Sequence, residues 1–556
     1  MTSTTNAATT NSSPPDFWPR FYLPLLLLLC AAYAWHPLMG FDDFWAHAGV
    51  GRWIWQNGRI PQETLFLWSG KIPWIAHSWL SQFTFYSLMA IGGEFYGPYL
   101  ALVFTVVMSA LPFALLWHLW SRCGRITILT PFLFSLAIQT SQERFLARPE
   151  LFTAFFLVCL MTFLIGWSRP LLADWPATLN RRQKLAAGGI VLSFIAWTNF
   201  HGAVAIGLML LVATVLVDLV QDRLAPRARL LALFGVCCLA AIFINPYGAR
   251  YWEALRPIQS YQFAFIDEWK PFWAPPPLPL EYVMGAALLV LLAAMAWALN
   301  PQRRWAHLLW VVLMSVAFLH ARRHLWLLSL ICLAVMAANA AAIDTQRLWR
   351  HWQQRRVQEE IPAKKPVKSR LRGNRLSGES PIPAHLRRRA HAAVIACIVM
   401  WLAVGPLWDI QALRGQYPVS DDVPRGIAAF IERHNLPGRM FNGFIDAPYL
   451  QWRFAEQRPL FMGHLNDYPD TVIRDYDDMI HATLRGRSRL DELNIGYVVL
   501  RSPYPGTPWP KLALYLEYNA QWARVYQDQN GAVWVRRTPE YEYLWRAGVK
   551  RSGARP

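Results

Sequence analysis

Two adjacent carboxylic acids stand directly after the first long apolar run of the chain. The run Phe21–Phe41 contains no Lys, Arg, Asp or Glu, and Asp42 and Asp43 follow it at once. Acids at the end of a membrane helix are costly to desolvate, and we therefore treat both as candidate catalytic residues. If Asp43 begins a helix, His47 lies one turn later on the same face. Capping of this helix is the alternative role, because Asp is a common N-cap residue.

Four arginines place positive charge near the predicted ends of apolar runs. Arg322 and Arg323 lie between two apolar runs, and we expect Arg144 and Arg148 at the same end of the molecule. Guanidinium groups are strong bidentate donors to oxyanions, so these residues are candidate binding residues. The alternative is that the side chains only extend from helix ends toward lipid phosphates.

Long runs without charged residues must position these groups. Phe95–Ser121 has 27 residues and Leu185–Val217 has 33. A helix as long as the second run would measure about 50 Å, whereas a bilayer core is about 30 Å thick. This run must therefore fold back, and its polar break contains Asn199 and His201. His201 is then either part of the site at the outer face or a structural residue packed in a turn.

The composition is typical of a membrane protein. Hydrophobic residues make up 54% of the 556 residues and charged residues only 16%, against about 25% charged residues in soluble domains. More than half of the net charge of +19 falls in Arg347–Arg389, with 13 Lys+Arg and 3 Asp+Glu. Such a loop is typically cytoplasmic and held by anionic lipid, so nucleic-acid binding gains no support. The seven cysteines show no metal or redox spacing.

The spans predict an α-helical polytopic membrane protein with about 11 to 13 transmembrane helices. The predicted divisions are a disordered tail (1–19), a transmembrane domain (20–408) with its first outer loop (39–77) and a basic cytoplasmic loop (344–389), and an extracytoplasmic domain (409–556). Three apolar segments must make an even number of crossings: His77–Gly92, Pro98–Trp120 and Ile126–Thr140. Either one of them is re-entrant or interfacial, or two of them share one crossing.

The C-terminal segment alternates helical and strand-like patterns. Asp421–His434 has capping acids followed by helical spacing, and Ile495–Arg501 and Ala532–Arg536 are predicted strands between Pro/Gly-rich turns. These features predict a small α/β domain. Five of its acids crowd together, namely Asp467, Asp470, Asp475, Asp477 and Asp478. They lack the central Gly and closing Glu of a calcium loop, so we interpret them as solvated acids and helix caps.

A set of motifs runs through the chain in order. Asp43–Pro61 reads DFWAHAGVGRWIWQNGRIP, and it is followed by Trp74-x-x-His77-x-Trp79-Leu80, Arg148-Pro149, Trp197-x-Asn199-x-His201-Gly202, Asn245-Pro246-Tyr247-Gly248 and Glu268-Trp269. This set resembles the GT-C superfamily of polytopic membrane glycosyltransferases over essentially the whole chain. The resemblance is to the bacterial branch that uses polyprenyl-phosphate sugars.

The resemblance implies a function and a set of site residues. A sugar would pass, with inversion, from a polyprenyl-phosphate donor to a lipid, glycan or protein acceptor at the outer face. Asp43 would act as general base, its pKa raised by exclusion of water and by the neighbouring Asp42. The four arginines would bind the donor phosphate. The supporting residues would be His47, His201, Asn199, Glu63 and His77.

Two departures from the family pattern concern acids. Thr64 stands where a second acid is usual, with Glu63 one place earlier, and Ser78 replaces a Glu. The missing and displaced acids argue against a metal-assisted mechanism; a divalent metal is kept only as an alternative, and no metal ligand is assigned. The expected location is the bacterial cytoplasmic membrane, with the C-terminal domain in the periplasm. A non-catalytic scaffold or a transporter in envelope polysaccharide assembly is the alternative function, although the polar residues gather at one predicted face and no internal repeat is found.

Overall fold

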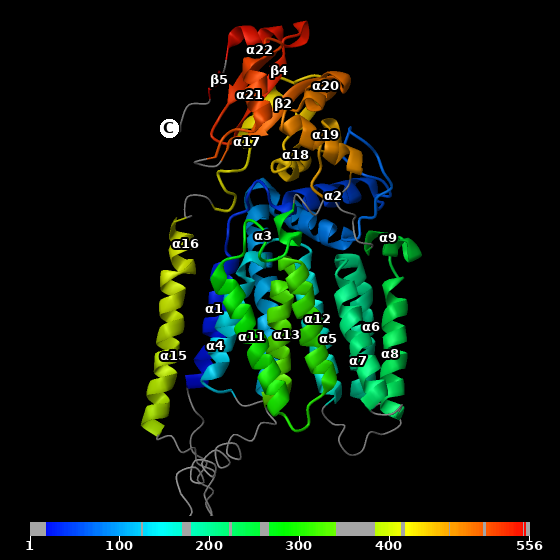
Figure 1. The fold of residues 1–556 in the computed structure, drawn as a ribbon, viewed down its shortest axis with the longest axis vertical. Helices are drawn as coiled ribbons and strands as arrows, with labels where there is room; N and C mark the ends of the chain where they lie inside the picture. The colour runs from blue at the N-terminus through cyan, green and yellow to red at the C-terminus, as the bar shows by residue number, and fades with distance from the viewer. Residues whose placement is uncertain are drawn as a thin grey trace, which may run out of the picture.

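The computed structural model describes residues 18–123, 126–168, 180–221, 225–255, 266–340, 384–412, 417–465, 468–503, 507–548 and 550–551. Residues 1–17 of the predicted tail and most of the predicted basic loop lie outside these ranges. Apolar helices form one layer of the molecule, and a small domain with a β-sheet lies beyond one end of that layer (Figure 1). The predicted fold class is therefore confirmed.

The helical layer is a bundle of apolar helices (Figure 1). Its helices are α1 (Tyr22–Ala34), α3 (Trp79–Cys123), α4 (Leu129–Ser141), α5 (Glu150–Ser168), α6 (Arg181–Phe200), α7 (Val204–Gln221), α8 (Pro226–Ile242), α11 (Leu280–Leu299), α12 (Trp305–His320), α13 (Leu325–Ala340) and α15 (Ala384–Val404). Short helices connect them, namely η1 (Trp18–Phe21), η2 (Gln142–Arg144), η3 (Gly248–Arg250), α9 (Tyr251–Leu255), η4 (Asp267–Trp269), η5 (Arg322–His324) and α16 (Pro406–Ala412).

Among the residues that the structure describes, five helical segments are long and apolar enough to cross a membrane. They are Trp79–Cys123, Val204–Gln221, Leu280–Leu299, Arg322–Ala340 and Arg388–Ile410. Three shorter apolar helices are Tyr22–Ala34, Glu150–Gly166 and Trp305–His320. The chain is thus an integral membrane protein by its fold and composition. The predicted total of 11 to 13 spans stays a prediction.

Helix α3 is bent sharply near its first third. Gly93 has a positive φ of 63° inside the helix, and a Cβ on Gly92 would lie 2.3 Å from the Gly97 nitrogen. Only glycine permits so close an approach of two backbone segments. The part before the bend packs against α2, whereas aromatic residues after it, such as Trp117, contact α1 and α4 in the bundle. Of the three segments whose crossing was open, the first therefore lies along α2.

Helix α2 (Asp43–Asn57) lies across the end of the bundle, between the helices and the C-terminal domain (Figure 1). It begins at Asp43, the case considered from the sequence, and its C-cap is Gly58, which has a left-handed φ of 61°. On its other face, Trp45 packs against Tyr449 and Trp452 of the C-terminal domain, with ring centroids 5.4 Å and 6.3 Å apart, whereas Phe44 faces Phe85 of α3. The Trp53 indole N–H also donates to Glu456 at 2.8 Å. Helix α2 is thus fixed from both sides.

The C-terminal domain contains a five-stranded sheet in the order β1-β2-β4-β3-β5. Its strands are β1 (Arg439–Asn442), β2 (Ile495–Arg501), β3 (Trp522–Gln527), β4 (Gly531–Arg536) and β5 (Lys550–Arg551). The β1–β2 and β3–β5 pairs are parallel and the other two pairs are antiparallel. Its helices are α17 (Arg425–Arg433), α18 (Ala447–Phe454), η7 (Ala455–Gln457), α19 (Asp470–Ile480), α20 (Leu484–Glu492), α21 (Lys511–Tyr518), η8 (Pro539–Tyr541) and α22 (Glu542–Ala547).

The two strands predicted from sequence are neighbouring interior strands of the sheet. Ile495–Arg501 forms β2, and Ala532–Arg536 lies within β4. They were recognisable because buried central strands carry continuous β-branched and apolar residues. The short β1 and the mixed-polarity β3 lack such a signal, and they were not predicted.

Candidate active site

Asp43 is held by side chains from two distant parts of the chain. Its Oδ2 lies 3.2 Å from Nε of Arg148, which follows α4, and its Oδ1 lies 2.7 Å from Nε2 of His464 in the C-terminal domain. His464 is 421 residues away in sequence. The first residue of α2 therefore joins the bundle to the C-terminal domain.

Glu268 in η4 is the centre of a group of arginines. Its Oε2 accepts hydrogen bonds from Arg144 at 2.6 Å and from Arg148 at 2.8 Å. Arg323 lies 3.5 Å from the other oxygen. Glu150, the first residue of α5, pairs with Arg144 and lies 3.7 Å from Arg323. Charge-assisted bonds of this kind are strong and fix the orientation of the guanidinium planes.

Short local elements position these groups. Arg144 ends η2, and Arg148 follows in the loop that leads into α5. Arg323 lies in η5, where its guanidinium stacks 4.2 Å above the ring of Trp269 in η4. The η4 and η5 turns are further joined by a bond from the Arg322 N–H to the Lys270 carbonyl at 3.0 Å. Three guanidinium groups and the three carboxylates of Asp43, Glu150 and Glu268 thus meet at the end of the bundle.

The two neighbouring acids differ in their electrostatics. Burial alone would raise the pKa of Asp43, but the Arg148 guanidinium and the His464 bond outweigh it, and the pKa lies well below its usual range. Burial raises the pKa of Asp42 to about 7, against the opposing effects of the Met39 N–H and Arg148. The expected rise in the pKa of Asp43 is therefore wrong, because two cationic or donor groups contact its carboxylate directly. The raised pKa belongs to Asp42.

Asp42 occupies the N-cap position of α2, but its side chain does not cap the helix. Its Oδ2 accepts a bond from the Met39 N–H at 2.7 Å. Its Oδ1 is buried without a hydrogen-bond partner among the described residues. The capping role considered for this pair of acids is thus absent, and Asp42 is a buried acid with one free oxygen.

Three predicted supporting histidines lie near one another and near the arginines of the site. His47 on α2 is buried, with its Nδ1 3.4 Å from the Gln82 amide, and burial lowers its pKa to about 3. Burial also lowers the pKa of His77. The rings of His77 and His201 are 6.3 Å apart, and Nδ1 of His201 accepts a bond from the Thr153 hydroxyl at 2.8 Å. Neutral imidazoles thus surround the charged groups.

Three other predicted residues lie outside this constellation. Arg322 donates to the carbonyls of Pro276 at 2.7 Å and Ala274 at 3.1 Å, so it fastens a loop rather than joining the carboxylates. Asn199 accepts from the Trp79 indole at 2.7 Å and donates to two carbonyls, which makes it a packing residue. Glu63 is a surface residue whose side chain is 59% exposed and pairs with Lys71.

Sequence reasoning missed His464, Glu150 and Glu268 as site residues. Glu268 stood in a recognised motif, and Glu150 follows Arg148-Pro149, so proximity to the motifs was a usable signal. His464 lies in a loop of the C-terminal domain and follows no recognised motif. Only the packing of that domain on α2 reveals its role.

The residues do not fit a divalent metal. No group of three or more His, Cys, Asp or Glu side chains among the described residues could hold a metal ion. The carboxylates of Asp43, Glu150 and Glu268 are instead occupied by guanidinium groups. No step below involves a metal.

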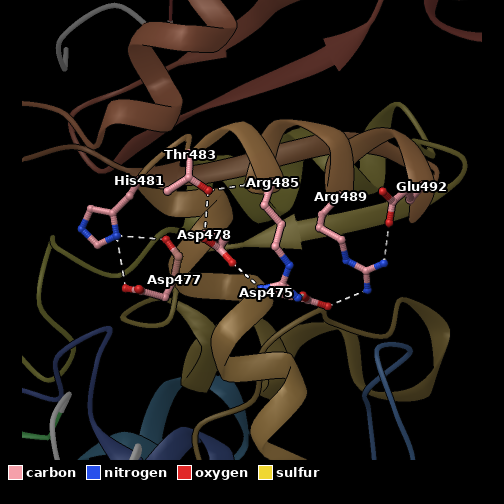
Figure 2. A network of polar contacts seen from close by, with 9 residues as sticks. Asp475, Asp477, Asp478, His481, Thr483, Arg485, Arg489 and Glu492 are labelled. Carbon is pink, nitrogen blue, oxygen red and sulfur yellow. Dashed lines mark hydrogen bonds and ion pairs between the residues drawn. The ribbon is translucent and has the colours of Figure 1, made fainter.

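The acid-rich segment of the C-terminal domain forms ion pairs of its own (Figure 2). Asp475 accepts from Arg485 at 2.8 Å and from Arg489 at 2.6 Å. Asp477 lies 3.2 Å from His481 on the surface. Asp467 lies outside the described residues. The interpretation as solvated acids and helix caps is therefore wrong for Asp475, which is buried between two arginines, whereas the Asp477 side chain is 42% exposed, as expected.

A second buried ionic group lies at the end of α7 that is far from the candidate active site. Asp218 is almost completely buried, with its Oδ2 3.3 Å from Arg227 and 3.6 Å from Arg304. The expectation that polar residues gather at one face is therefore incomplete. These charges join the ends of α7, α8 and α12, where desolvated ion pairs specify how helices pack.

Solved structures of other proteins share the fold of this chain, whereas sequence comparisons found no match. No family model matches the chain, and no curated protein sequence matches it. The archaeal oligosaccharyltransferase AglB from Archaeoglobus fulgidus, in complex with an inhibitory peptide and a dolichol-phosphate, matches with a TM-score of 0.58. The match covers 87% of this chain and 70% of that one at 11% identity.

Two further solved structures agree. ArnT from Cupriavidus metallidurans, bound to undecaprenyl phosphate, matches with a TM-score of 0.51 over 94% of this chain and 98% of its own, at 13% identity. The arabinofuranosyltransferase AftD from Mycobacteria matches with a TM-score of 0.50 over 93% of this chain and 41% of its own, at 15% identity. All three are GT-C glycosyltransferases. The chain described here therefore has the GT-C fold, as the motifs of its sequence implied.

Proposed function

We propose that the chain is a membrane glycosyltransferase that transfers a sugar from a polyprenyl-phosphate donor. The acceptor is a hydroxyl group of a lipid, glycan or protein at the outer face of a bacterial cytoplasmic membrane. The single observation that carries this proposal is the fixed contact of Asp43 with Arg148, within a group of three arginines at the end of the bundle. A carboxylate next to cationic donors matches what this transfer needs on its acceptor and leaving-group sides.

The reaction replaces one C–O bond by another. The acceptor oxygen attacks the anomeric carbon from the face opposite the phosphate, and the bond between that carbon and the phosphate oxygen breaks with inversion. The leaving polyprenyl phosphate keeps the electron pair. Arg144, Arg148 and Arg323 are the donors that would stabilise its charge, exchanging part of their present contacts with Glu268 and Glu150 for phosphate oxygens.

Asp43 supplies negative charge on the acceptor side. Its low pKa keeps it ionised, and it promotes loss of the acceptor proton either directly, as the resemblance implies, or through a group that it contacts. The C-terminal domain covers α2 and shares a hydrophobic core with it, which supports a role in orienting the acceptor. AglB and ArnT, which have the same fold, bind dolichol-phosphate and undecaprenyl phosphate.

Reconstituted protein tests this proposal directly. The protein is mixed with labelled polyprenyl-phosphate sugars and candidate acceptors, and transfer by Asp43→Asn is compared with transfer by the unaltered chain. A loss of at least about 100-fold is expected for a group that assists proton transfer. Asp477→Asn, on the surface of the C-terminal domain, is the matched control. Unchanged transfer by Asp43→Asn would remove the assigned role, and absence of transfer by any form would favour the scaffold alternative.

A further inference from the structure

The C-terminal domain places one imidazole directly on the carboxylate of the site. Nε2 of His464 lies 2.7 Å from Oδ1 of Asp43. The ring stacks on Phe444, with the ring centroids 4.7 Å apart and the planes inclined by 29°. Phe444 in turn donates its backbone N–H to the Tyr476 hydroxyl at 3.1 Å. The imidazole therefore has a fixed position and a fixed plane.

The contact with Asp43 determines which nitrogen of His464 carries the proton. An ionised carboxylate only accepts hydrogen bonds, so Nε2 must be the donor. In the neutral ring, Nδ1 then holds the free lone pair. Nδ1 is buried and has no hydrogen-bond partner among the described residues. A buried acceptor without a donor is unfavourable, and such atoms in folded proteins call for an explanation.

A hydroxyl group of the acceptor would satisfy this atom. We propose that His464 is the general base of the transfer, that its Nδ1 takes the proton of the acceptor hydroxyl, and that Asp43 orients the ring and stabilises the imidazolium. This inference rests on the proposed function and moves the base from α2 to the C-terminal domain. The arrangement follows the general logic of carboxylate–imidazole pairs, in which the carboxylate fixes the tautomer and supports the charged ring.

The electrostatics of Asp43 support this division of roles. With Arg148 on one oxygen and His464 on the other, the carboxylate has a lowered pKa, and a weakly basic carboxylate is a poor proton acceptor. The same negative charge suits it to stabilise an imidazolium. His47 and His77, although close, are less suitable bases because burial lowers their pKa.

The step is balanced as follows. The O–H bond of the acceptor breaks and its proton binds Nδ1, while the oxygen forms a bond to the anomeric carbon. The bond from that carbon to the phosphate oxygen breaks, and its electron pair stays on the polyprenyl phosphate. The imidazolium then returns its proton to water. No oxidant, reductant or metal takes part.

Two substitutions separate a base from a residue that only positions Asp43. In His464→Gln, the side-chain amide N–H can still donate to Asp43, but no basic nitrogen remains. In His464→Ala, both functions are lost and a space for free imidazole is created. The transfer assay with a labelled polyprenyl-phosphate sugar is run on the full chain in lipid vesicles, with and without added imidazole. Thermal unfolding checks that each variant is folded.

We expect kcat to fall at least about 100-fold in both variants, with a KM for the donor that changes less than about threefold. Imidazole should raise the rate of His464→Ala at least about tenfold and leave His464→Gln unchanged. His481→Ala is the matched control, because His481 also pairs with an aspartate but lies on the surface. Its rate should equal that of the unaltered chain.

Three results would overturn the inference. His464→Gln within about threefold of the unaltered chain would show that only the hydrogen bond to Asp43 matters. If imidazole fails to raise the low activity of His464→Ala, the loss of transfer would be due to altered packing. Both results require transfer by the unaltered chain and leave the proposed function intact. Absence of transfer by that chain would refute the proposed function, and this inference with it.

Discussion

Asp42 is expected to make the stability of the protein depend on pH. Burial raises its pKa to about 7, from an ordinary value of 3.8, and the negative charges of Asp43 and Asp422 add to this effect. The folded protein therefore binds this proton more tightly than the unfolded chain does. Consequently, the contribution of Asp42 to stability is most favourable at low pH and falls as the pH rises from about 4 to about 7.

The size of the effect follows from the shift. Three pKa units correspond to about 4 kcal/mol, at about 1.4 kcal/mol per unit, and this is an order-of-magnitude figure. Asp42→Asn removes the charge but keeps an oxygen that can accept from the Met39 N–H. The variant should thus be more stable than the unaltered chain above pH 7, by up to about 4 kcal/mol. The advantage should vanish near pH 4.

Thermal unfolding in detergent at several pH values measures this advantage, with the fluorescence of the 29 tryptophans as signal. A Tm increase of a few degrees is expected at pH 8 for Asp42→Asn. The exposed Asp470→Asn serves as the matched control and should show no growing advantage. A Tm difference for Asp42→Asn that is constant from pH 4 to pH 8, or a lower Tm at pH 8, would refute the reasoning.

Two further predictions concern packing around the site. Glu268→Gln removes the charge that two buried guanidinium groups share. Transfer should therefore fall at least about tenfold, and the Tm should drop by an amount matching about 3–5 kcal/mol. Glu63→Gln, at an exposed ion pair, should lower stability by less than about 1 kcal/mol. Equal Tm values for both would contradict this. Gly51→Ala would put a Cβ 2.0 Å from the Gln82 carbonyl oxygen, so α2 must move away from α3 and both Tm and transfer should fall. Gly188→Ala has open space around it inside α6, so transfer should be unchanged and Tm unchanged or slightly higher, because Ala is the better helix former. Equal Tm and transfer values for the two variants would show that α2 can shift freely.

Much of the architecture was predictable because the bilayer restricts what a chain can do. Backbone groups in lipid must be satisfied within the segment, so uncharged runs of sufficient length become helices. The start of α2 at Asp43 and the core strand β2 were likewise visible as local patterns of charge and apolar residues. The motifs around Asp43 and Arg148 implied the GT-C fold, which the solved structures share.

The contact partners of each site residue could not be predicted from local sequence patterns. Arg322 and Arg323 are adjacent and chemically identical, yet one binds loop carbonyls and the other faces Glu268. Neighbouring Asp42 and Asp43 have pKa shifts of opposite direction, because only Asp43 is contacted by Arg148 and His464. Such differences depend on which way a side chain points, and periodicity does not contain that information.

The amino-acid sequence by itself determined that this chain enters a membrane, where α2 begins, and that an acid stands at that point. The tertiary structure alone decided the chemistry of that acid. Charges interact most strongly at short distance and where water is excluded, so what matters most is which groups packing brings into contact. Here the docking of the C-terminal domain on α2 sets a histidine 421 residues away against Asp43, and no local pattern encodes that contact.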